Sequence, residues 1–186
     1  MYRLFFQIAV FIAVIQIGFT GVSFAQSEPD TLDTEKAQES NPYFNNSGLP
    51  LPRFISFSSN KVFMRTGPGL RYPIRWIYTK KGLPIEVMQE FDTWRKIRDY
   101  EGEEGWVHQS LLSGKRTAIV QTEKNKPAAL MKKPDLMAKP VAMIESKVVI
   151  PLEECGKDWC KTEIQGFDGW IEKKFIWGVY AGSEFD

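Results

Sequence analysis

Two cysteines and a single histidine are the residues of this 186-residue chain best suited to nucleophilic or metal chemistry. Cys155 and Cys160 stand five positions apart, and His108 lies far from both in sequence. A zinc site at the cysteines would need two more ligands, which the sequence around them does not offer. We therefore expect no metal site and no cofactor.

The N-terminus has the pattern of a cleavable signal peptide, which sets the compartment in which the cysteines act. Arg3 precedes a largely apolar run at residues 4–19, and the small residues Ser23 and Ala25 precede Gln26. This pattern predicts a signal peptide at residues 1–25 with cleavage between Ala25 and Gln26. An uncleaved membrane anchor is the alternative, because the run approaches the length that a spanning helix needs. Cleavage predicts an exported chain with no stable membrane span.

Export favours a disulfide between Cys155 and Cys160, because disulfides persist in oxidising compartments. Two free thiols are the alternative. A disulfide closing so short a loop contributes about 2 kcal/mol through chain entropy. It also removes the thiolate that a cysteine peptidase would need beside His108. We therefore expect no catalytic residue, and we expect His108 to lie on a strand with a backbone partner.

Residues 26–50 have the composition of a disordered segment. Their charged residues are mostly acidic, and Tyr43 and Phe44 are their only aromatic residues, so the segment has little apolar surface to bury. The rest of the chain is mildly basic, which is too weak a signal for nucleic-acid binding. An ordinary solvated surface explains this charge, and attraction to an anionic polymer is the alternative.

A repeat organises the remainder of the chain. Trp94 and Trp159 are 65 residues apart, and Trp106 and Trp170 are 64 apart, each of the latter two following a glycine. Alternating apolar residues precede each pair, as in half-buried strands, and residues 91–93 form a predicted tight turn. A unit of this length with several short strands predicts a small β-barrel.

The fold class is therefore all-β, with two tandem small β-barrels after the signal peptide and the disordered segment. The first spans residues 51–114 and the second residues 115–182, followed by a tail at 183–186. We expect the paired tryptophans to fill the small cores. The repeat places Glu90 and Arg95 opposite the two cysteines, and we expect them to form an exposed ion pair. The short connection at residues 113–118 predicts that the two barrels touch.

A resemblance supports this architecture. The run Lys61 to Pro73, which includes Gly67-Pro68-Gly69, together with the strands around Trp94 and Gly105-Trp106, resembles the bacterial SH3 domain. The chain is similar to exported proteobacterial proteins with two such domains in tandem, so the resemblance implies that both barrels are SH3-like. That resemblance implies a periplasmic location and cell-wall peptide or glycan as the usual ligand. The second repeat has Lys132-Lys133-Pro134 in place of the glycine-rich loop, which departs from the family pattern.

The candidate ligand-binding residues gather around the first loop. Its arginines could grip a carboxylate, and its aromatic side chains could form a shallow groove. Burial of those aromatic side chains in the core is the alternative. The candidate residues are Arg65, Arg71, Tyr72, Arg75, Trp76, Tyr78 and Trp106.

The function expected from the sequence is that of a non-enzymatic periplasmic binding or scaffolding module that associates with cell-wall polymer. A structural accessory that docks onto a cell-envelope protein is the alternative. A cell-wall peptidase is a third hypothesis, and the expected disulfide argues against it.

Overall fold

The computed structural model describes residues 45–186, and their regular structure is almost entirely β-strand. Residues 45–186 all belong to one compact unit. The all-β prediction is confirmed. The predicted signal peptide, its cleavage point at Ala25 and Gln26, and residues 26–44 of the acidic segment lie outside the described residues. In the described part, no helix has the length and apolarity to cross a bilayer.

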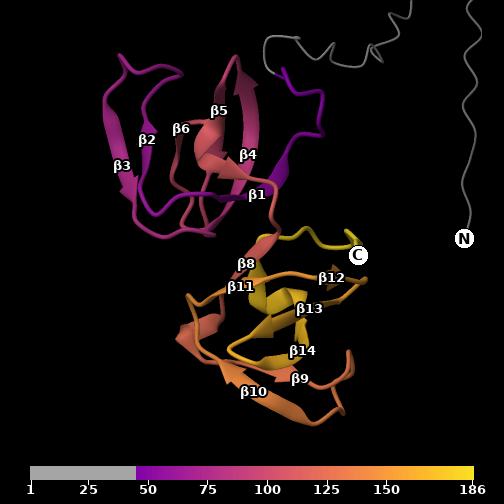
Figure 1. The fold of residues 1–186 in the computed structure, drawn as a ribbon. Coiled ribbons are helices and arrows are strands. Elements are labelled where there is room, and N and C mark those ends of the chain that lie inside the picture. Colours follow the sequence, from indigo (N-terminus) through magenta and orange to yellow (C-terminus); the bar gives the residue numbers. More distant parts are fainter. Residues whose placement is uncertain (1–44) are drawn as a thin grey trace, which may run out of the picture. The chain divides into compact units, whose positions relative to one another are not determined.

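The N-terminal module contains one antiparallel sheet, with strand order β3-β2-β6-β5-β4-β1-β7 (Figure 1). A short 3-10 helix, η2 (Gln109–Leu111), precedes the last strand. The strands of the N-terminal module are β1 (Arg53–Phe57), β2 (Val62–Arg65), β3 (Ile74–Tyr78), β4 (Pro84–Phe91), β5 (Trp94–Arg98), β6 (Glu104–His108) and β7 (Leu112–Ser113).

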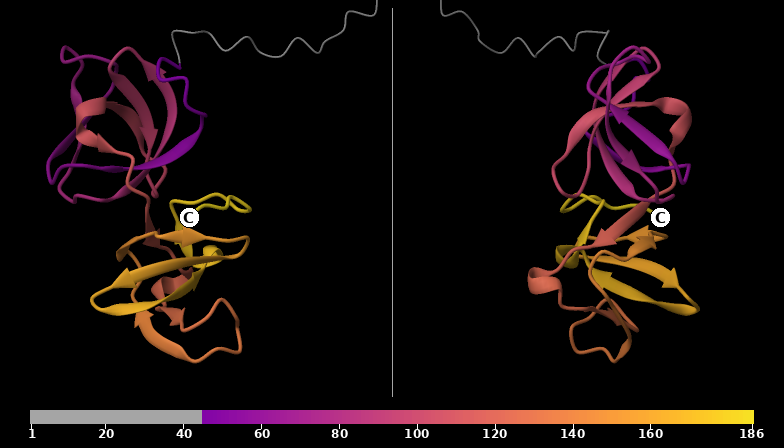
Figure 2. Two further views of the ribbon diagram at one scale, coloured as in Figure 1. Left: turned by 45° about the vertical axis from the view of Figure 1, so that its right-hand side comes forward. Right: turned by 90° about the vertical axis from the view of Figure 1, so that its left-hand side faces the viewer.

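The C-terminal module repeats this plan with two smaller sheets, ordered β10-β9-β14-β13-β12 and β11-β8-β15. Strands β9, β14 and β13 pair with one another as β2, β6 and β5 do in the first module (Figure 2). Closure of each module into a barrel stays a prediction. The elements of the C-terminal module are β8 (Thr117–Val120), η3 (Glu123–Asn125), β9 (Ala128–Met131), β10 (Pro140–Ile144), β11 (Val149–Pro151), β12 (Glu154–Cys155), β13 (Trp159–Ile164), β14 (Phe167–Glu172), η4 (Lys173–Phe175) and β15 (Ile176–Trp177).

Aliphatic side chains make up most of the two core clusters, with Phe57 and Tyr78 in the first, and of the paired tryptophans expected to fill the cores only Trp94 is buried. Ile97 and Val107 on neighbouring strands are fully buried. Trp106 lies one residue away from Val107 and pairs with Lys96, so it points to the opposite, outer face of the sheet. None of the four repeat tryptophans belongs to either core cluster. The two core clusters are therefore built mainly from aliphatic residues, and Trp106 lies on the outer face.

The glycine of each Gly-Trp pair allows two strands to cross closely. A Cβ on Gly105 would lie 2.8 Å from the Arg65 carbonyl oxygen, and one on Gly169 would lie 2.7 Å from the Met131 carbonyl oxygen. Contacts this short require a shift of the opposite backbone. A glycine therefore precedes the tryptophan in both repeats because a larger residue would not fit where β2 approaches β6 and where β9 approaches β14.

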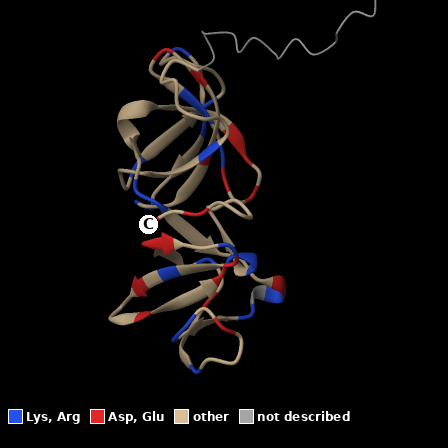
Figure 3. Ribbon diagram, turned by 90° about the vertical axis from the view of Figure 1, so that its right-hand side faces the viewer, with Lys and Arg blue, Asp and Glu red and all other residues tan. Residues whose placement is uncertain are grey.

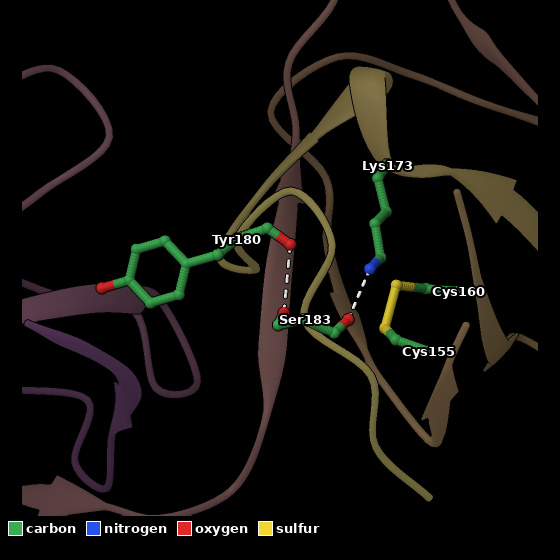
Figure 4. Close-up of a disulfide and its surroundings, with 5 residues drawn as sticks. All are labelled: Cys155, Cys160, Lys173, Tyr180 and Ser183. Atoms are coloured by element: carbon green, nitrogen blue, oxygen red, sulfur yellow. Dashed lines mark hydrogen bonds between the residues drawn. A yellow bond between two sulfur atoms is a disulfide. The ribbon is translucent and has the colours of Figure 1, made fainter. Parts of the chain in front are cut away.

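The predicted disulfide between Cys155 and Cys160 is confirmed (Figure 4). The two residues are direct partners across β12 and β13, their Cα atoms are 4.1 Å apart, and both are buried. Cys155 also exchanges two backbone hydrogen bonds with Phe185, which attaches the C-terminal tail to the edge of this sheet. Lys173 donates a hydrogen bond to the Ser183 carbonyl oxygen and holds the same tail.

Glu90 and Arg95 are cross-strand partners as predicted, but they are buried rather than exposed. The Arg95 Nε atom lies 3.2 Å from Glu90 Oε1, and Arg53 from β1 forms a second ion pair with the same carboxylate. Ser47 donates hydrogen bonds to Glu90 from its backbone N–H and its hydroxyl group. These added donors explain why the carboxylate can lie inside, since a buried charge needs several partners. They also tie residues near 47, within the predicted disordered segment, to the sheet.

Side chains of the two modules contact one another. Ile119 from β8 packs within the core cluster of the N-terminal module. The Phe54 ring lies 4.9 Å from the Trp177 ring and 4.5 Å from the Tyr180 ring. The Tyr180 hydroxyl group donates a 2.8 Å hydrogen bond to Glu86. The predicted contact between the modules is therefore present.

Candidate ligand-binding site

The loop between β2 and β3, residues 66–73, is held by its own backbone and by one arginine. The Thr66 N–H donates to the Pro73 carbonyl oxygen and closes the loop at 3.1 Å. Arg65 Nη1 donates to the carbonyl oxygens of Leu70 and Tyr72, at 3.2 and 2.7 Å. Arg65, predicted to grip a ligand, therefore uses one guanidinium nitrogen to hold the loop.

Tyr72 packs on the backbone of Gly67. A Cβ on Gly67 would lie 2.5 Å from the Tyr72 ring, so only glycine lets the ring approach so closely. Arg71 is exposed and lies over the outer part of that ring, with its guanidinium carbon 5.2 Å from the ring centroid. Among residues 45–186, no carboxylate forms an ion pair with Arg71. Arg71 and Tyr72 thus form an exposed cation beside an aromatic ring on a constrained loop.

Arg75 lies at a β-bulge and points to a different partner. The register of β2 and β3 shifts between Met64 and Arg65, which leaves Arg75 as the extra residue. Its guanidinium group forms an exposed ion pair with Glu103 at 2.9 Å. The same bulge recurs between β9 and β10, where Val141 is the extra residue.

A row of side chains crosses the outer face of the sheet below the loop. Ile74 pairs with Arg65, Arg65 with Trp106, and Trp106 with Lys96, so these four residues share one face. All four are at least partly exposed. The row joins a cation, an indole ring and a second cation, and it brings together two of the predicted site residues, Arg65 and Trp106.

Trp76 and Tyr78 belong to the other face of β3. Trp76 pairs with Met64 and is 47% exposed because β3 is the edge of the sheet. Tyr78 is buried, and its hydroxyl group donates a 2.9 Å hydrogen bond to Asp99. Burial, together with this hydrogen bond, raises the pKa of Tyr78 above its usual value. Tyr78 therefore serves the core and has almost no surface to offer a ligand.

Four further residues share the outer face with Arg65 and Trp106 and were not predicted from the sequence: Phe63, Ile74, Ile77 and Lys96. Phe63 pairs with Ile77 and is two residues from Arg65. The alternation of residues 62–65 could have placed Phe63 beside Arg65. Ile74 and Lys96 required knowledge of the strand order, because their neighbours lie on other strands.

His108 lies at the end of β6 and caps the short helix η2. Its Nδ1 atom accepts a hydrogen bond from the Ser110 N–H at the start of η2, which matches the predicted backbone partner. Its ring meets the Trp94 ring edge-on at 5.4 Å. No group of three or more His, Cys, Asp or Glu side chains within residues 45–186 is arranged to hold a metal ion.

Comparison with known families gives two matches, both to the bacterial SH3 domain, at residues 58–114 and 124–178. The chain belongs to the bacterial SH3 domain family. The N-terminal module is its first SH3 domain and the C-terminal module its second. The resemblance noted in the sequence is thus confirmed for both repeats, including the one whose loop departs from the family pattern.

Solved structures similar to these SH3 domains include three NlpC or NlpC/P60 proteins. NlpC1 from Trichomonas vaginalis is 12% identical, with 70% of this chain and 47% of that chain covered and a TM-score of 0.31. NlpC2 from the same organism is 9% identical, with 69% and 49% covered and a TM-score of 0.31. A NlpC/P60 family protein from Bacillus cereus is 12% identical, with 69% and 57% covered and a TM-score of 0.30.

This chain thus spans about half the length of those proteins. Comparison with curated proteins gives no match.

Proposed function

We propose that the chain is an exported, periplasmic and non-enzymatic module whose first SH3 domain binds cell-wall polymer. The observation that carries this proposal is the constrained loop at residues 66–73, which presents Arg71 without an ion pair among the described carboxylates. A pre-organised loop loses little conformational entropy on binding. Arg71 is therefore the residue best placed to contact an anionic ligand.

The chemistry around Arg71 suits a ligand that carries both carboxylates and sugar rings. An arginine can bind a carboxylate through two parallel hydrogen bonds, and the stem peptides of peptidoglycan carry carboxylates. The Tyr72 ring beside Arg71 and the half-buried Trp106 below it offer flat apolar faces. Arg65 and Arg75 contribute less, because one holds the loop and the other already pairs with Glu103.

Docking onto a cell-envelope protein is the second candidate, and strand β3 favours it. This strand lies at one edge of the sheet, and Ile74, Trp76 and Ile77 on it are all exposed. An edge strand with exposed apolar side chains can pair with a strand of another protein.

Retention on purified, protein-free peptidoglycan sacculi separates the two candidates. We expect Arg71→Gln to reduce retention about tenfold or more, since a charge-assisted pair contributes about 1.5–3 kcal/mol, with an unchanged melting temperature. The matched control is Lys133→Gln in the equivalent loop of the second domain. Retention that Arg71→Gln leaves intact would contradict the assignment of this site. Absence of retention on sacculi, with capture of a protein from periplasmic extract, would favour the second candidate.

A further inference from the structure

The loop of the second SH3 domain at residues 132–139 has the backbone fold of the loop at 66–73, but different surface chemistry. The Lys132 N–H donates to the Lys139 carbonyl oxygen at 3.0 Å, as Thr66 does to Pro73. Within the loop, Asp135 donates to Lys133 and Ala138 donates to Asp135, which repeats the bonds of Gly69 and Tyr72. The loop therefore keeps the same backbone hydrogen bonds, although it lacks the glycines, the tyrosine and the arginine at the Arg65 position, where Met131 stands.

Matching the equivalent backbone hydrogen bonds aligns the two loop tips residue by residue. Leu70 corresponds to Leu136, and the cation Arg71 corresponds to Met137. Leu136 is 67% exposed and Met137 is 91% exposed, the highest value among the large apolar residues of the described chain. The Met137 N–H donates to the Asp135 carboxylate at 2.9 Å, which fixes the backbone of the tip. Two adjacent apolar side chains are thus held in solvent on a constrained loop.

Lysines surround this apolar tip. The loop contains Lys132, Lys133 and Lys139 against a single acid, Asp135, which gives it a net charge of +2. All three lysines are exposed, and no ion pair found in residues 45–186 includes any of them. Elsewhere on the described chain, blue and red residues are interspersed (Figure 3). Figure 2 shows the loop extending beyond the ends of β9 and β10.

We propose that this loop is a membrane-surface anchor that inserts Leu136 and Met137 among the headgroups of an anionic phospholipid bilayer. Lysine is depleted at protein–protein interfaces, whose energetic centres use tryptophan, tyrosine and arginine. Lysine around aliphatic side chains suits a bilayer, because the apolar stem lies along the acyl chains while the ammonium group meets the lipid phosphate. A protruding loop also needs no complementary groove on a flat lipid surface.

Each part of the loop has a separate role. The lysines supply an attraction that falls with salt, and the two apolar side chains supply one that salt does not screen. The anchor does not depend on ligand binding by the first SH3 domain, because Arg71 and Met137 lie on different loops. A chain with both would hold cell-wall polymer with one domain and a membrane surface with the other.

Sedimentation with lipid vesicles tests the anchor. The protein used is the chain from Gln26 onward, which contains the compact unit and omits the apolar residues 4–19. We expect binding to vesicles of equal parts phosphatidylglycerol and phosphatidylcholine, and much weaker binding to phosphatidylcholine alone. Replacing the three lysines with glutamine should reduce binding to anionic vesicles on the order of 100-fold, at about 1 kcal/mol for each charge.

The double variant Leu136→Ser with Met137→Ser should reduce vesicle binding about tenfold or more and leave retention on sacculi unchanged. The matched control is Leu70→Ser in the first SH3 domain, which should leave vesicle binding unchanged. Melting temperatures of all variants should match the parent, because the residues are exposed. Equal binding of the parent chain and the double variant to anionic vesicles would overturn the proposal. Loss of sacculus retention in the double variant would overturn it too, and would assign the loop to cell-wall polymer.

Discussion

At the residue scale, the two SH3 domains fasten the same hairpin position by different chemistry. Cys155 and Cys160 are covalently joined in the second domain, while Glu90 and Arg95 are ionic partners in the first. A buried ion pair is stable only when further hydrogen bonds satisfy both charges. Arg53 and Ser47 provide these bonds to Glu90. The first domain therefore stabilises this position with residues N-terminal to the hairpin, whereas the second domain stabilises it with a disulfide.

Glu90→Gln should lower the stability of the first domain by about 3 kcal/mol, because it leaves two arginines beside an uncharged amide. Burial alone raises the pKa of Glu90, but the hydrogen bonds from Arg53 and Ser47 and the charge of Arg95 outweigh it, so the pKa is lowered from 4.5. The resulting stabilisation is complete above the unfolded-state pKa and is lost as the pH falls through the lowered folded-state pKa. Denaturant titrations across that acidic range measure both effects.

The control for this variant is Glu104→Gln. The pKa of Glu104 is also lowered, chiefly by its hydrogen bond with Lys96, but this pair is exposed. Its removal should cost less than about 1 kcal/mol. An equal loss of stability in both variants would show that burial of Glu90 adds nothing.

Part of this arrangement could be predicted from the sequence. Alignment of the repeats on their tryptophans placed Glu90 and Arg95 at the positions of the two cysteines, and the observed register confirms that they face each other across the hairpin. Burial of the pair could not be predicted, because its other partners, Arg53 and Ser47, lie 37 and 43 residues from Glu90 in the chain. The same limit applies to the site: Arg71 and Tyr72 follow from a local motif, whereas the neighbours of Trp106 depend on strand order.

At the element scale, the disulfide joins β12 to β13 and also positions the strand that receives the C-terminal tail. Replacing both cysteines with alanine should lower stability by roughly 2 kcal/mol. It should also release the Phe185 amide, which donates to the Cys155 carbonyl oxygen at 2.9 Å. Hydrogen exchange at Phe185 should accelerate more than exchange at Ile171 in the core of the same domain. Equal acceleration at both amides would contradict a local role in holding the tail.

The crossing of β2 and β6 gives a second prediction for an element. Gly105→Ala should cost about 1–3 kcal/mol, because the added methyl group meets the Arg65 carbonyl oxygen and the Met64 side chain. Gly114→Ala is the control, since a Cβ there meets nothing within 4 Å. Chemical denaturation of the two variants measures the difference. Similar stabilities would mean that β2 and β6 can separate without cost.

The succession of strands along each repeat was predictable from the sequence, but the expectation that Trp106 fills the core put it on the wrong side of the sheet. Large apolar residues are ordinarily expected inside, and the alternation of Trp106 with Val107 fits either face. The pairing of Trp106 with Lys96 places Trp106 on the outer face, because Lys96 is too polar for the core. The bulge at Arg75 also had no sequence signal, and it directs that arginine to Glu103.

At the scale of the whole molecule, the two SH3 domains share apolar packing as well as a connection. Contact between them was predictable from the short linker at residues 113–118. Its form was not predictable, because β8 belongs to the second domain while its Ile119 packs in the core cluster of the first. The neighbouring Ala118 and Val120 belong to the second core, so the strand is divided between the two cores by its alternating faces.

This division predicts that residues 45–186 unfold as one cooperative body. Ile119→Ala should lower stability by about 2–5 kcal/mol, because Ile119 is almost fully buried. It should also separate the unfolding transitions of the two domains, since it removes packing that they share. Ile150→Ala is the matched control, because Ile150 is equally buried but belongs to the second core alone. The control should lower stability by a similar amount while keeping one transition. Hydrogen exchange read at Ile97 and Ile171 reports on each domain in turn. Two separate transitions in the parent chain would contradict the shared packing, because the domains would then be stable independently of Ile119.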